Sequence, residues 1–431
     1  MKKLSSAAKS GLHGTIVVPG DKSISHRAIM LGAISEGDTM ITHFLEGEDC
    51  LSTLQAFRDL GVKIDKTADQ VVVHGKGENA LHQSEQPLDM GNSGTTTRLM
   101  MGLLAGLPFA STLIGDASLS KRPMKRVSEP LKAFGVTVET TDGKLPATVK
   151  GGSVHAANYQ LQVASAQVKS ALILASLFAE EPSTIIEALP TRNHTEIMLR
   201  QFGADVKTAS DDLTITVQPH PQLTGQNIYV PGDISSAAFF MVAAAIIPGS
   251  DVVLKKVNLN PTRTGILKVL EKMQAAVTVT DLPSAGEPIG DIRIKVSHLK
   301  PITLTAEDVP ALVDEIPLVA LLAACADGVS EISGAEELRV KETDRIVAIA
   351  NELRKLGVKV TEKPDGMTII GQSSWKINNH HLDSYGDHRI GMMTAIAALR
   401  TDETLYLQNP DSINISYPNF FEDLAKINQG A

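Results

Sequence analysis

A repeat of roughly 72 residues runs through the whole sequence and limits the folds that this chain can adopt. Six apolar segments that predict helices begin behind a turn or a β-rich run, near Asp21, Asn92, Ser165, Asp233, Asp314 and Asp387. In phase with them, a helical segment ends in Gly before a β-rich run, in LGVKI (60–64), FGVTV (134–138), FGADV (202–206) and LGVKV (356–360), with a weaker copy, MQAAVTV, at 273–279. The spacing predicts six α/β units, each with a helix, a strand, a second helix and paired strands.

The tetrapeptide Val-Pro-Gly-Asp occurs twice, from Val18 to Asp21 and from Val230 to Asp233, each time between a β-rich run and an apolar run. If each copy marks a crossing between domains, one domain is continuous over residues 22–230 and the other joins residues 1–21 to 231–431. The two turns then form a hinge, and a ligand is expected in the cleft between the domains. A chain of 431 residues is long enough for two such domains.

Composition excludes several classes of function. A formal net charge of -9 argues against a general binder of nucleic acid or of anionic membranes. The apolar runs fall well short of the roughly 18 residues of a membrane span, and the first residues lack the apolar segment of a signal peptide. The two cysteines, Cys50 and Cys325, lie far apart, so we expect neither a disulfide scaffold nor a cysteine-based zinc site. A cytoplasmic protein without a metal is the resulting expectation.

Cations and hydroxyls gather at the first predicted helix start. PGDKSISHR, at 19–27, places Lys22, Ser23 and Arg27 near the positive end of a helix dipole, which favours an anion bound among them. For this segment alone, a capped surface helix whose cations point into water is the open alternative. GNSGT, at 91–95, has the small residues that let backbone N–H groups approach a phosphate.

The segment SLSKRPMKR, at 118–126, spaces Lys121 from Lys125 and Arg122 from Arg126 by one helical turn. Like charges at this spacing repel one another on a helix. The segment therefore favours an anionic partner, with a solvated basic face as the alternative.

KETDR, at 341–345, places Lys341 and Arg345 one turn apart, with Glu342 and Asp344 between them, at the start of a helix predicted to run on to Leu356. A surface network of salt bridges is the alternative here. DHR, at 387–389, adds a further cation, Arg389, beside a capping aspartate.

Asp314 and Glu342 are the acid and base candidates, because carboxylates among cations are where proton transfer can be tuned. Neither a Walker motif nor a GxGxxG turn after a strand is found, so we expect no nucleotide cofactor. No Ser–His–Asp or Cys–His set stands out. The residues thus predict a two-lobed α/β protein for a substrate with several anionic groups, and they leave the reaction open.

Nine motifs together resemble the 5-enolpyruvylshikimate-3-phosphate synthase (3-phosphoshikimate 1-carboxyvinyltransferase) family of enolpyruvyl transferases, over essentially the whole chain. In family order they are PGDKSISHR, GNSGTTTRL, KRPMKR, SAQVKSA, PGDISSAAFF, NPTRTG, DEIP, KETDR and GDHRIGM. The resemblance implies a two-domain inverse α/β barrel of six βαβαββ units, three in each domain. It also implies a monomer without cofactor that transfers the enolpyruvyl group of phosphoenolpyruvate to the 5-hydroxyl of shikimate 3-phosphate and releases phosphate, on the shikimate pathway to chorismate and the aromatic amino acids.

By this resemblance, three residues are catalytic: Lys22 touches phosphoenolpyruvate and the target hydroxyl, Asp314 is the base for that hydroxyl, and Glu342 is the acid that protonates the methylene carbon. The implied ligands of shikimate 3-phosphate are Lys22, Ser23, Arg27, Ser165, Gln167, Arg192, Asp314 and Lys341. The implied ligands of phosphoenolpyruvate are Lys22, Gly94, Arg122, Gln167, Arg345 and Arg389, the last two gripping its carboxylate.

Two positions depart from the family pattern. Ala166 stands where many members have a second serine, with Arg192 as the candidate replacement, and Ile415 stands where some members place a phosphate-binding lysine. These departures suggest the less common branch of the family. Sensitivity to glyphosate-like inhibitors stays undecided, although Gly94 is unblocked.

Two alternatives remain within this fold. The sister transferase that modifies UDP-N-acetylglucosamine typically has Lys-Asn after the first turn and a reactive cysteine near position 115. Lys22-Ser23 and a cysteine-free loop at 115–126 disfavour it here. A non-catalytic phosphosugar-binding relative is disfavoured because Lys22, Asp314 and Glu342 are all present.

Overall fold

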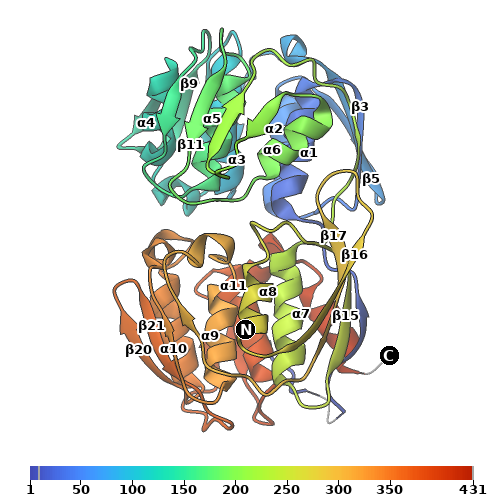
Figure 1. The fold of residues 1–431 in the computed structure, drawn as a ribbon, viewed down its shortest axis with the longest axis vertical. Helices are drawn as coiled ribbons and strands as arrows, with labels where there is room; N and C mark the ends of the chain where they lie inside the picture. The colour runs from blue at the N-terminus through green and yellow to red at the C-terminus, as the bar shows by residue number, and fades with distance from the viewer. Residues whose placement is uncertain (8–9, 430–431) are drawn as a thin grey trace. The chain divides into compact units, whose positions relative to one another are not determined.

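The computed structural model describes residues 1–7 and 10–429, and the chain divides into two compact units. Unit 1 comprises Met1–Pro19 and Pro231–Ala431, and unit 2 is Gly20–Val230 (Figure 1). Each unit has a hydrophobic core of its own. Among the described residues, none of the helices combines the length and the apolar character that crossing a membrane would require.

Unit 2 contains three four-stranded sheets, in the orders β14-β3-β5-β4, β6-β7-β9-β8 and β10-β11-β13-β12. Their strands are β3 (Glu36–Thr42), β4 (Lys63–Lys66), β5 (Gln70–Lys76), β6 (Leu88–Asp89), β7 (Ser111–Ile114), β8 (Thr137–Thr141), β9 (Lys144–Lys150), β10 (Asn158–Gln160), β11 (Ser183–Ile186), β12 (Val206–Thr208), β13 (Thr214–Val217) and β14 (Asn227–Tyr229). The helices are α1 (Lys22–Ile34), α2 (Glu48–Asp59), α3 (Gly94–Leu103), α4 (Lys125–Leu131), α5 (Ala166–Ser176) and α6 (His194–Phe202).

Unit 1 contains two four-stranded sheets, β16-β17-β15-β2 and β18-β19-β21-β20, and a three-stranded sheet, β1-β23-β22. Their strands are β1 (Lys2–Lys3), β2 (His13–Ile16), β15 (Asp251–Asn258), β16 (Ala276–Leu282), β17 (Ile289–Lys295), β18 (Thr303–Leu304), β19 (Val329–Ile332), β20 (Lys359–Lys363), β21 (Gly366–Ile370), β22 (His381–Asp383) and β23 (Tyr406–Gln408). The helices are α7 (Ile234–Ile246), α8 (Gly265–Lys272), α9 (Ile316–Cys325), α10 (Arg345–Lys355), α11 (His388–Ala398) and α12 (Phe420–Asn428).

The five four-stranded sheets share one pairing scheme. In each of these sheets, an edge strand runs parallel to the strand that follows the first helix of the α/β repeat. Strand β6, for example, runs parallel to β7, which follows α3. That second strand then pairs antiparallel with the last strand of a hairpin, as β7 does with β9. Parallel strands need a long crossover connection, usually a helix, whereas antiparallel strands can be joined by a tight turn. Each of these α/β repeats contains one parallel pair and one antiparallel hairpin. The six α/β units predicted from the repeat are confirmed, except that the sixth, with the β1-β23-β22 sheet, has no hairpin of paired strands among the described residues after its second helix, α12.

Both Val-Pro-Gly-Asp turns connect an edge strand of one unit to the first helix of the other. Strand β2 pairs with β15 in unit 1, yet the chain continues from it into α1 of unit 2. Strand β14 pairs with β3 in unit 2, and the chain continues from it into α7 of unit 1. The two copies of the turn therefore have the same task in the chain path, which accounts for the repeated sequence.

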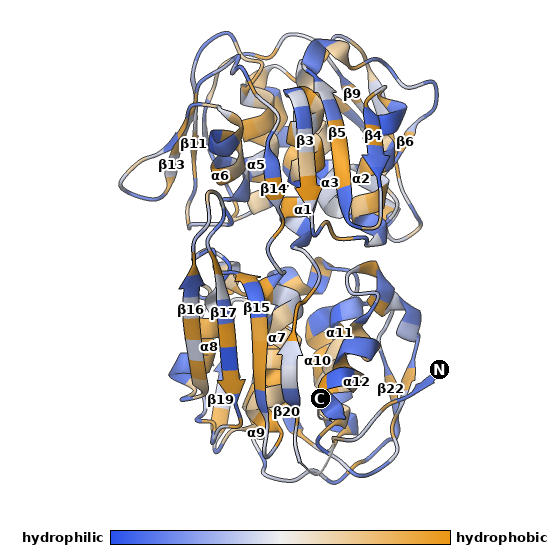
Figure 2. Ribbon diagram, turned by 90° about the vertical axis from the view of Figure 1, so that its right-hand side faces the viewer, coloured by the Kyte–Doolittle hydropathy of each residue, from blue (hydrophilic) through white to orange (hydrophobic). Residues whose placement is uncertain are grey.

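The first helix of each α/β repeat packs in the hydrophobic core of unit 1 or unit 2. Asp21, Ser93, Ser165, Asp233 and Asp387 cap five of them by accepting a hydrogen bond from a backbone N–H of the first turn. Every residue of α7 is buried, as expected for a helix that is apolar on all sides. Strands such as β15 and β17 instead show both colours along their length in Figure 2, because one face packs on the core and the other meets solvent.

The glycine stops after the second helices adopt the left-handed backbone that ends a helix. Gly61, Gly135, Gly203 and Gly357 have φ of 92°, 74°, 105° and 89°. In the weaker copy, Gln274 takes the same position after α8 with φ of 61°. A side chain with a Cβ is strained in this conformation, so the weaker repeat carries a local cost that the other copies avoid.

We expect Gln274→Gly to raise the free energy of unfolding of unit 1 by about 0.5–1 kcal/mol, because glycine adopts positive φ without steric cost. The single tryptophan, Trp375, lies in unit 1, so its fluorescence during denaturant unfolding measures the change. Glu271→Gly, inside α8, is the control and should lower stability by about 1 kcal/mol. A lower midpoint for Gln274→Gly would contradict the account.

Candidate active site

The start of α1 carries the first predicted cations. The Asp21 carboxylate caps the helix by accepting from the backbone N–H of Ile24 at 3.0 Å. Lys22, the first helical residue, donates from Nζ to Oδ2 of the buried Asp49 at 3.0 Å. Ser23 lies half-buried beside it. Since the Lys22 side chain is only 20% exposed and its charge is paired, the ammonium is held in one place.

Arg27, one turn further along α1, is 4% exposed and links three elements. Its Nε donates to Thr195 Oγ1 at 2.7 Å, its Nη2 to Ser170 Oγ at 2.8 Å, and its Nη1 to the carbonyl of Ser23 at 3.0 Å. Burial, together with the charges of Lys22 and Arg27, holds the pKa of His26 well below its ordinary value. The imidazole is therefore neutral at physiological pH and adds no charge to the cations beside it.

Two guanidinium groups converge on Gly94, the first residue of α3. A Cβ added at Gly94 would lie 3.0 Å from Nη1 of Arg98 and 3.3 Å from Nη1 of Arg122. Arg122 Nη2 also donates to Oδ1 of Asn92 at 2.7 Å. Because Gly94 has no side chain, both guanidinium groups lie close to the helix N-terminus, which is an arrangement suited to an anion.

The start of α5 is joined to the start of α3. Ser165 caps α5, and the Gln167 side chain accepts from Arg98 Nη1 at 2.6 Å and donates to Thr95 Oγ1 at 2.9 Å. Ala166 is half-buried, and Arg192 is half-buried in the loop that enters α6. Unit 2 therefore brings together the N-termini of α1, α3 and α5 with most of the predicted site residues of that unit.

The structure corrects the prediction for SLSKRPMKR. A short 3-10 helix ends at Lys121, Arg122 is extended with φ of −75° and ψ of 142°, and α4 begins only at Lys125. The pairs Lys121/Lys125 and Arg122/Arg126 therefore do not stack on one helix, because the residue before Pro123 is excluded from the helical region. Arg122 reaches Gly94 from an extended segment.

In unit 1, Arg345 is the centre of a cluster of acidic groups. It is 1% exposed, and it donates from Nε to Asp387 Oδ2 at 2.7 Å, from Nη2 to Glu342 Oε2 at 2.7 Å and from Nη1 to Asp314 Oδ1 at 3.4 Å. Burial alone lowers the pKa of the guanidinium, but the charges of Asp387, Glu342 and Asp314 outweigh burial and raise that pKa above its ordinary value. Arg345 therefore stays charged and orders the two predicted acid and base groups.

Arg389, at the start of α11, approaches the same carboxylate. Its Nε lies 3.7 Å from Asp314 Oδ1, so Asp314 stands between two arginines. Asp314 and Glu342 keep 18% and 20% of their side-chain surface exposed, whereas both guanidinium groups are buried. The two carboxylates are thus more exposed than the guanidinium groups that they contact.

Lys341 lies outside this arrangement. Its Nζ pairs with Glu337 at 2.9 Å, and its backbone is extended ahead of α10, whose cap is Asp344. The expected like-charge pair of Lys341 and Arg345 on one helix is therefore wrong, because the cap starts the helix at Arg345.

Several buried partners escaped the sequence analysis. Arg98 could have been found from its spacing, one turn after Gly94 on α3. Asp49, which pairs with Lys22, and the buried Arg263, which donates to Asp233 at 3.1 Å and to Ser235 at 2.8 Å, have no local signal. Their partners lie 27 to 30 residues away in the sequence.

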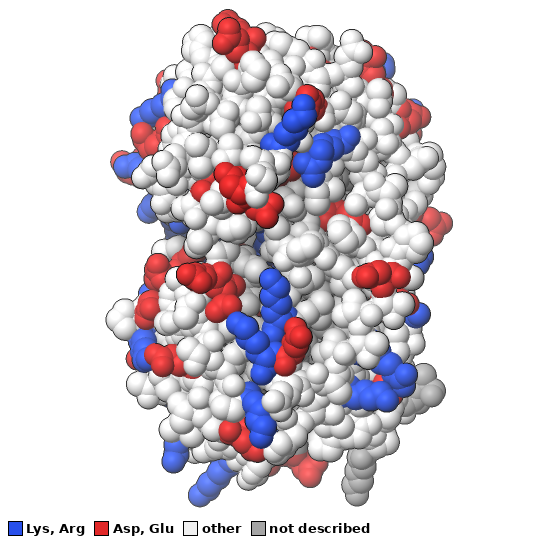
Figure 3. All heavy atoms as spheres, viewed as in Figure 1, with Lys and Arg blue, Asp and Glu red and all other residues white. Residues whose placement is uncertain are grey.

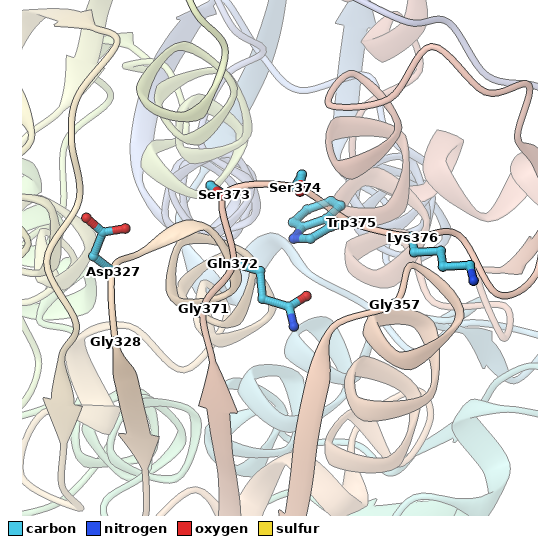
Figure 4. A pocket seen from close by; sticks show the side chains of 9 residues that line it. All are labelled: Asp327, Gly328, Gly357, Gly371, Gln372, Ser373, Ser374, Trp375 and Lys376. Carbon is cyan, nitrogen blue, oxygen red and sulfur yellow. The ribbon is translucent and has the colours of Figure 1, made fainter.

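On the face drawn in Figure 3, both units carry acidic and basic side chains, and in unit 1 several basic side chains lie together beside an acidic one. An open hollow of about 760 Å³ lies in unit 1 beside Gly328, Gly371 and Trp375. Figure 4 shows the residues that line it, and none of the predicted site residues is among them. Within the described residues, no group of three or more His, Cys, Asp or Glu side chains is arranged to hold a metal ion.

The family model of EPSP synthase (3-phosphoshikimate 1-carboxyvinyltransferase) matches residues 7–424. The 3-phosphoshikimate 1-carboxyvinyltransferase of Lactiplantibacillus plantarum is 57% identical over 430 residues, which cover 100% of both chains. The chain belongs to the EPSP synthase family. It is therefore a transferase, and the family predicted from its motifs is confirmed.

Solved structures support the same fold. The EPSP synthase of Acinetobacter baumannii has 45% sequence identity and a TM-score of 0.87, with 99% of this chain and 97% of that chain covered. The enolpyruvyl transferase NikO of Streptomyces tendae, with 16% identity, a TM-score of 0.80 and the same coverage, shows the fold alone. The predicted fold class of this EPSP synthase family member, a two-domain inverse α/β barrel, is confirmed.

Proposed function

We propose that this EPSP synthase family member transfers the enolpyruvyl group of phosphoenolpyruvate to the 5-hydroxyl of shikimate 3-phosphate, and that both units contribute to the reaction. The proposal rests on two groups of side chains, one in each unit, whose chemistry fits the two parts of the reaction. Unit 2 gathers cations at three helix N-termini, and unit 1 holds two partly exposed carboxylates against buried arginines. The first set suits two phosphorylated substrates, and the second suits proton transfer.

For shikimate 3-phosphate, we assign the ligands of unit 2 to Lys22, Ser23, Arg27, Ser165, Gln167 and Arg192. Arg27 and Gln167 support this assignment because their side chains are fixed by hydrogen bonds before a ligand arrives. A ligand then binds without the entropic cost of ordering them. Lys341 of unit 1 is assigned to the same substrate.

For phosphoenolpyruvate, we assign Lys22, Gly94, Arg122 and Gln167 to the phosphate side and Arg345 with Arg389 to the carboxylate. The close approach of the Arg98 and Arg122 guanidinium groups to Gly94 supports the first part. Binding of the carboxylate by Arg345 requires that one of its two 3.4 Å contacts, the one to Asp314, give way.

The reaction then proceeds by addition and elimination. Glu342, in its protonated form, gives its proton to the methylene carbon of phosphoenolpyruvate, while Asp314 takes the proton of the attacking 5-hydroxyl. The new C–O bond gives a tetrahedral ketal phosphate. Loss of a proton from the new methyl group and cleavage of the bond to the phosphate oxygen restore the double bond and release phosphate. Lys22, Arg122 and the helix N-termini stabilise the charge on that phosphate. Closure of the two units about the 18–21 and 230–233 turns would exclude water from the substrates. We also propose that the protein is a monomer and acts in the cytoplasm.

The assay that tests this function measures phosphate released from phosphoenolpyruvate with and without shikimate 3-phosphate. We expect release only when shikimate 3-phosphate is present, together with a product heavier than it by one enolpyruvyl group. A parallel reaction with UDP-N-acetylglucosamine as acceptor should release none. Release with UDP-N-acetylglucosamine alone would favour the sister transferase, and the absence of any release would refute the proposal.

A further inference from the structure

Unit 2 contains a triad of fully buried charges that no proposed step of the reaction uses. Lys169 on α5, Glu187 after β11 and Glu196 on α6 are 1%, 3% and 1% exposed. Lys169 Nζ lies 2.8 Å from Glu187 Oε2 and 2.9 Å from Glu196 Oε1. One ammonium thus holds two carboxylates away from water.

The triad closes the loop that carries Arg192. Lys169 Nζ also donates to the carbonyl of Thr191 at 3.2 Å. The Thr191 hydroxyl donates to Glu187 Oε1, and its backbone N–H donates to Glu187 Oε2 at 3.5 Å. The backbone carbonyl and the backbone N–H of Thr191, the residue before Arg192, are therefore both hydrogen-bonded to charged side chains.

The triad also adjoins the contacts of Arg27. Ser170 follows Lys169 on α5, and Thr195 precedes Glu196 on α6. These two hydroxyls are the groups to which Arg27 donates, and Thr195 donates to Ser170 at 2.7 Å. On each helix, one of two consecutive residues belongs to the triad and the other orients Arg27. A shift of α6 against α5 would therefore move the guanidinium.

Stability alone gives little reason for such a triad. Buried ion pairs can often be replaced by packed apolar side chains without loss of stability, because desolvation offsets most of the attraction. Their directional hydrogen bonds, however, fix one register between the elements that they join. Here those elements are α5, α6 and the loop at 187–193, which carry or orient Ser165, Gln167, Arg27 and Arg192.

We propose that Lys169, Glu187 and Glu196 are positioning residues for the phosphate-binding half of the shikimate 3-phosphate site. The inference rests on the proposed function, because it concerns the geometry of ligands assigned to that substrate. The triad sets the positions of Arg27 and of the loop before Arg192. Of the groups assigned to phosphoenolpyruvate, only Gln167 lies on an element that the triad joins, and its own bonds to Arg98 and Thr95 hold it in place.

Glu196→Gln tests this proposal in the full-length enzyme. The amide keeps the size of the side chain but weakens its bond to Lys169. We expect the KM for shikimate 3-phosphate to rise about tenfold, while kcat and the KM for phosphoenolpyruvate stay within about twofold, because the loss is confined to substrate positioning. Thr191→Val removes the hydroxyl that donates to Glu187 but leaves all three charges in place, so it should change the same KM in the same direction by a smaller factor.

Tyr417→Phe is the control, because it also removes a buried hydrogen bond, to Asp423, but in unit 1 and away from the assigned groups. It should leave both KM values unchanged. If Glu196→Gln and Thr191→Val left the KM for shikimate 3-phosphate within twofold of the original, the triad would be purely structural and the proposal would fail. That result is distinct from failure of the proposed function, in which the unchanged enzyme itself would show no release dependent on shikimate 3-phosphate.

In combination with Arg192→Ala, the effect of Glu196→Gln on this KM should fall well below tenfold, because the triad acts in part through the Arg192 loop. Equal effects of Glu196→Gln with and without Arg192 would remove that loop from the proposal.

Discussion

Replacing Glu342 by Gln is expected to lower kcat by about 10² to 10⁴-fold, with little change in either KM. An amide has nearly the shape of the carboxylate and still accepts from Arg345 Nη2, so the cluster around Arg345 is kept. It cannot deliver the proton that the methylene carbon of phosphoenolpyruvate needs, and general acid catalysis is worth about that factor. Steady-state kinetics with each substrate varied in turn measure the change.

Glu362→Gln is the matched control. Glu362 also accepts from an arginine in unit 1, Arg339, but lies outside the assigned groups. Its substitution should leave kcat within about twofold. An unchanged kcat in Glu342→Gln would exclude Glu342 as the acid, and a rise in both KM values at constant kcat would make it a binding residue instead.

Arg345→Met is expected to abolish turnover and to lower the stability of unit 1 by about 3–5 kcal/mol. The substitution leaves Asp387, Glu342 and Asp314 without the buried charge that they share. Unfolding followed through Trp375 fluorescence measures the loss. The deficit should narrow as the pH is lowered, because protonated carboxyl groups need no counter-charge.

Arg339→Met is the control for charge removal in the same unit. Arg339 pairs with Asp344 and Glu362 but keeps 27% of its side-chain surface exposed, so its loss should cost less than about 1 kcal/mol. Equal losses from the two substitutions would show that burial of the Arg345 cluster carries no special weight.

The sequence predicts the frame of this fold well because the signals for it are local. Each helix boundary is marked by a residue within one turn of it, so it can be recognised in a short segment. N-terminal caps such as Asp21, Ser165 and Asp387 begin a helix, and glycines such as Gly203 end one. The repeat then multiplies a weak local signal six times. The fold class and the family followed from these patterns together with the motifs.

Side-chain partners could not be predicted in the same way, because they depend on which elements meet. Lys169 and Glu187 are 18 residues apart in the sequence, and Lys22 and Asp49 are 27 apart. Neither pair has a spacing that marks it. The charge pairs inferred from spacing were wrong for a related reason: Pro123 and the Asp344 cap interrupt the helices that the spacing assumed. The roles assigned to individual residues stay proposals.

The most direct test of the central claim is a crystal structure of the slow Glu342→Gln variant with phosphoenolpyruvate and shikimate 3-phosphate bound. The account predicts that both substrates share one site, with Lys22, Arg27 and Arg122 of unit 2 and Lys341, Arg345 and Arg389 of unit 1 in contact with them. Substrates bound to one unit alone, or to two separate surfaces, would contradict the claim that the two sets of residues act together.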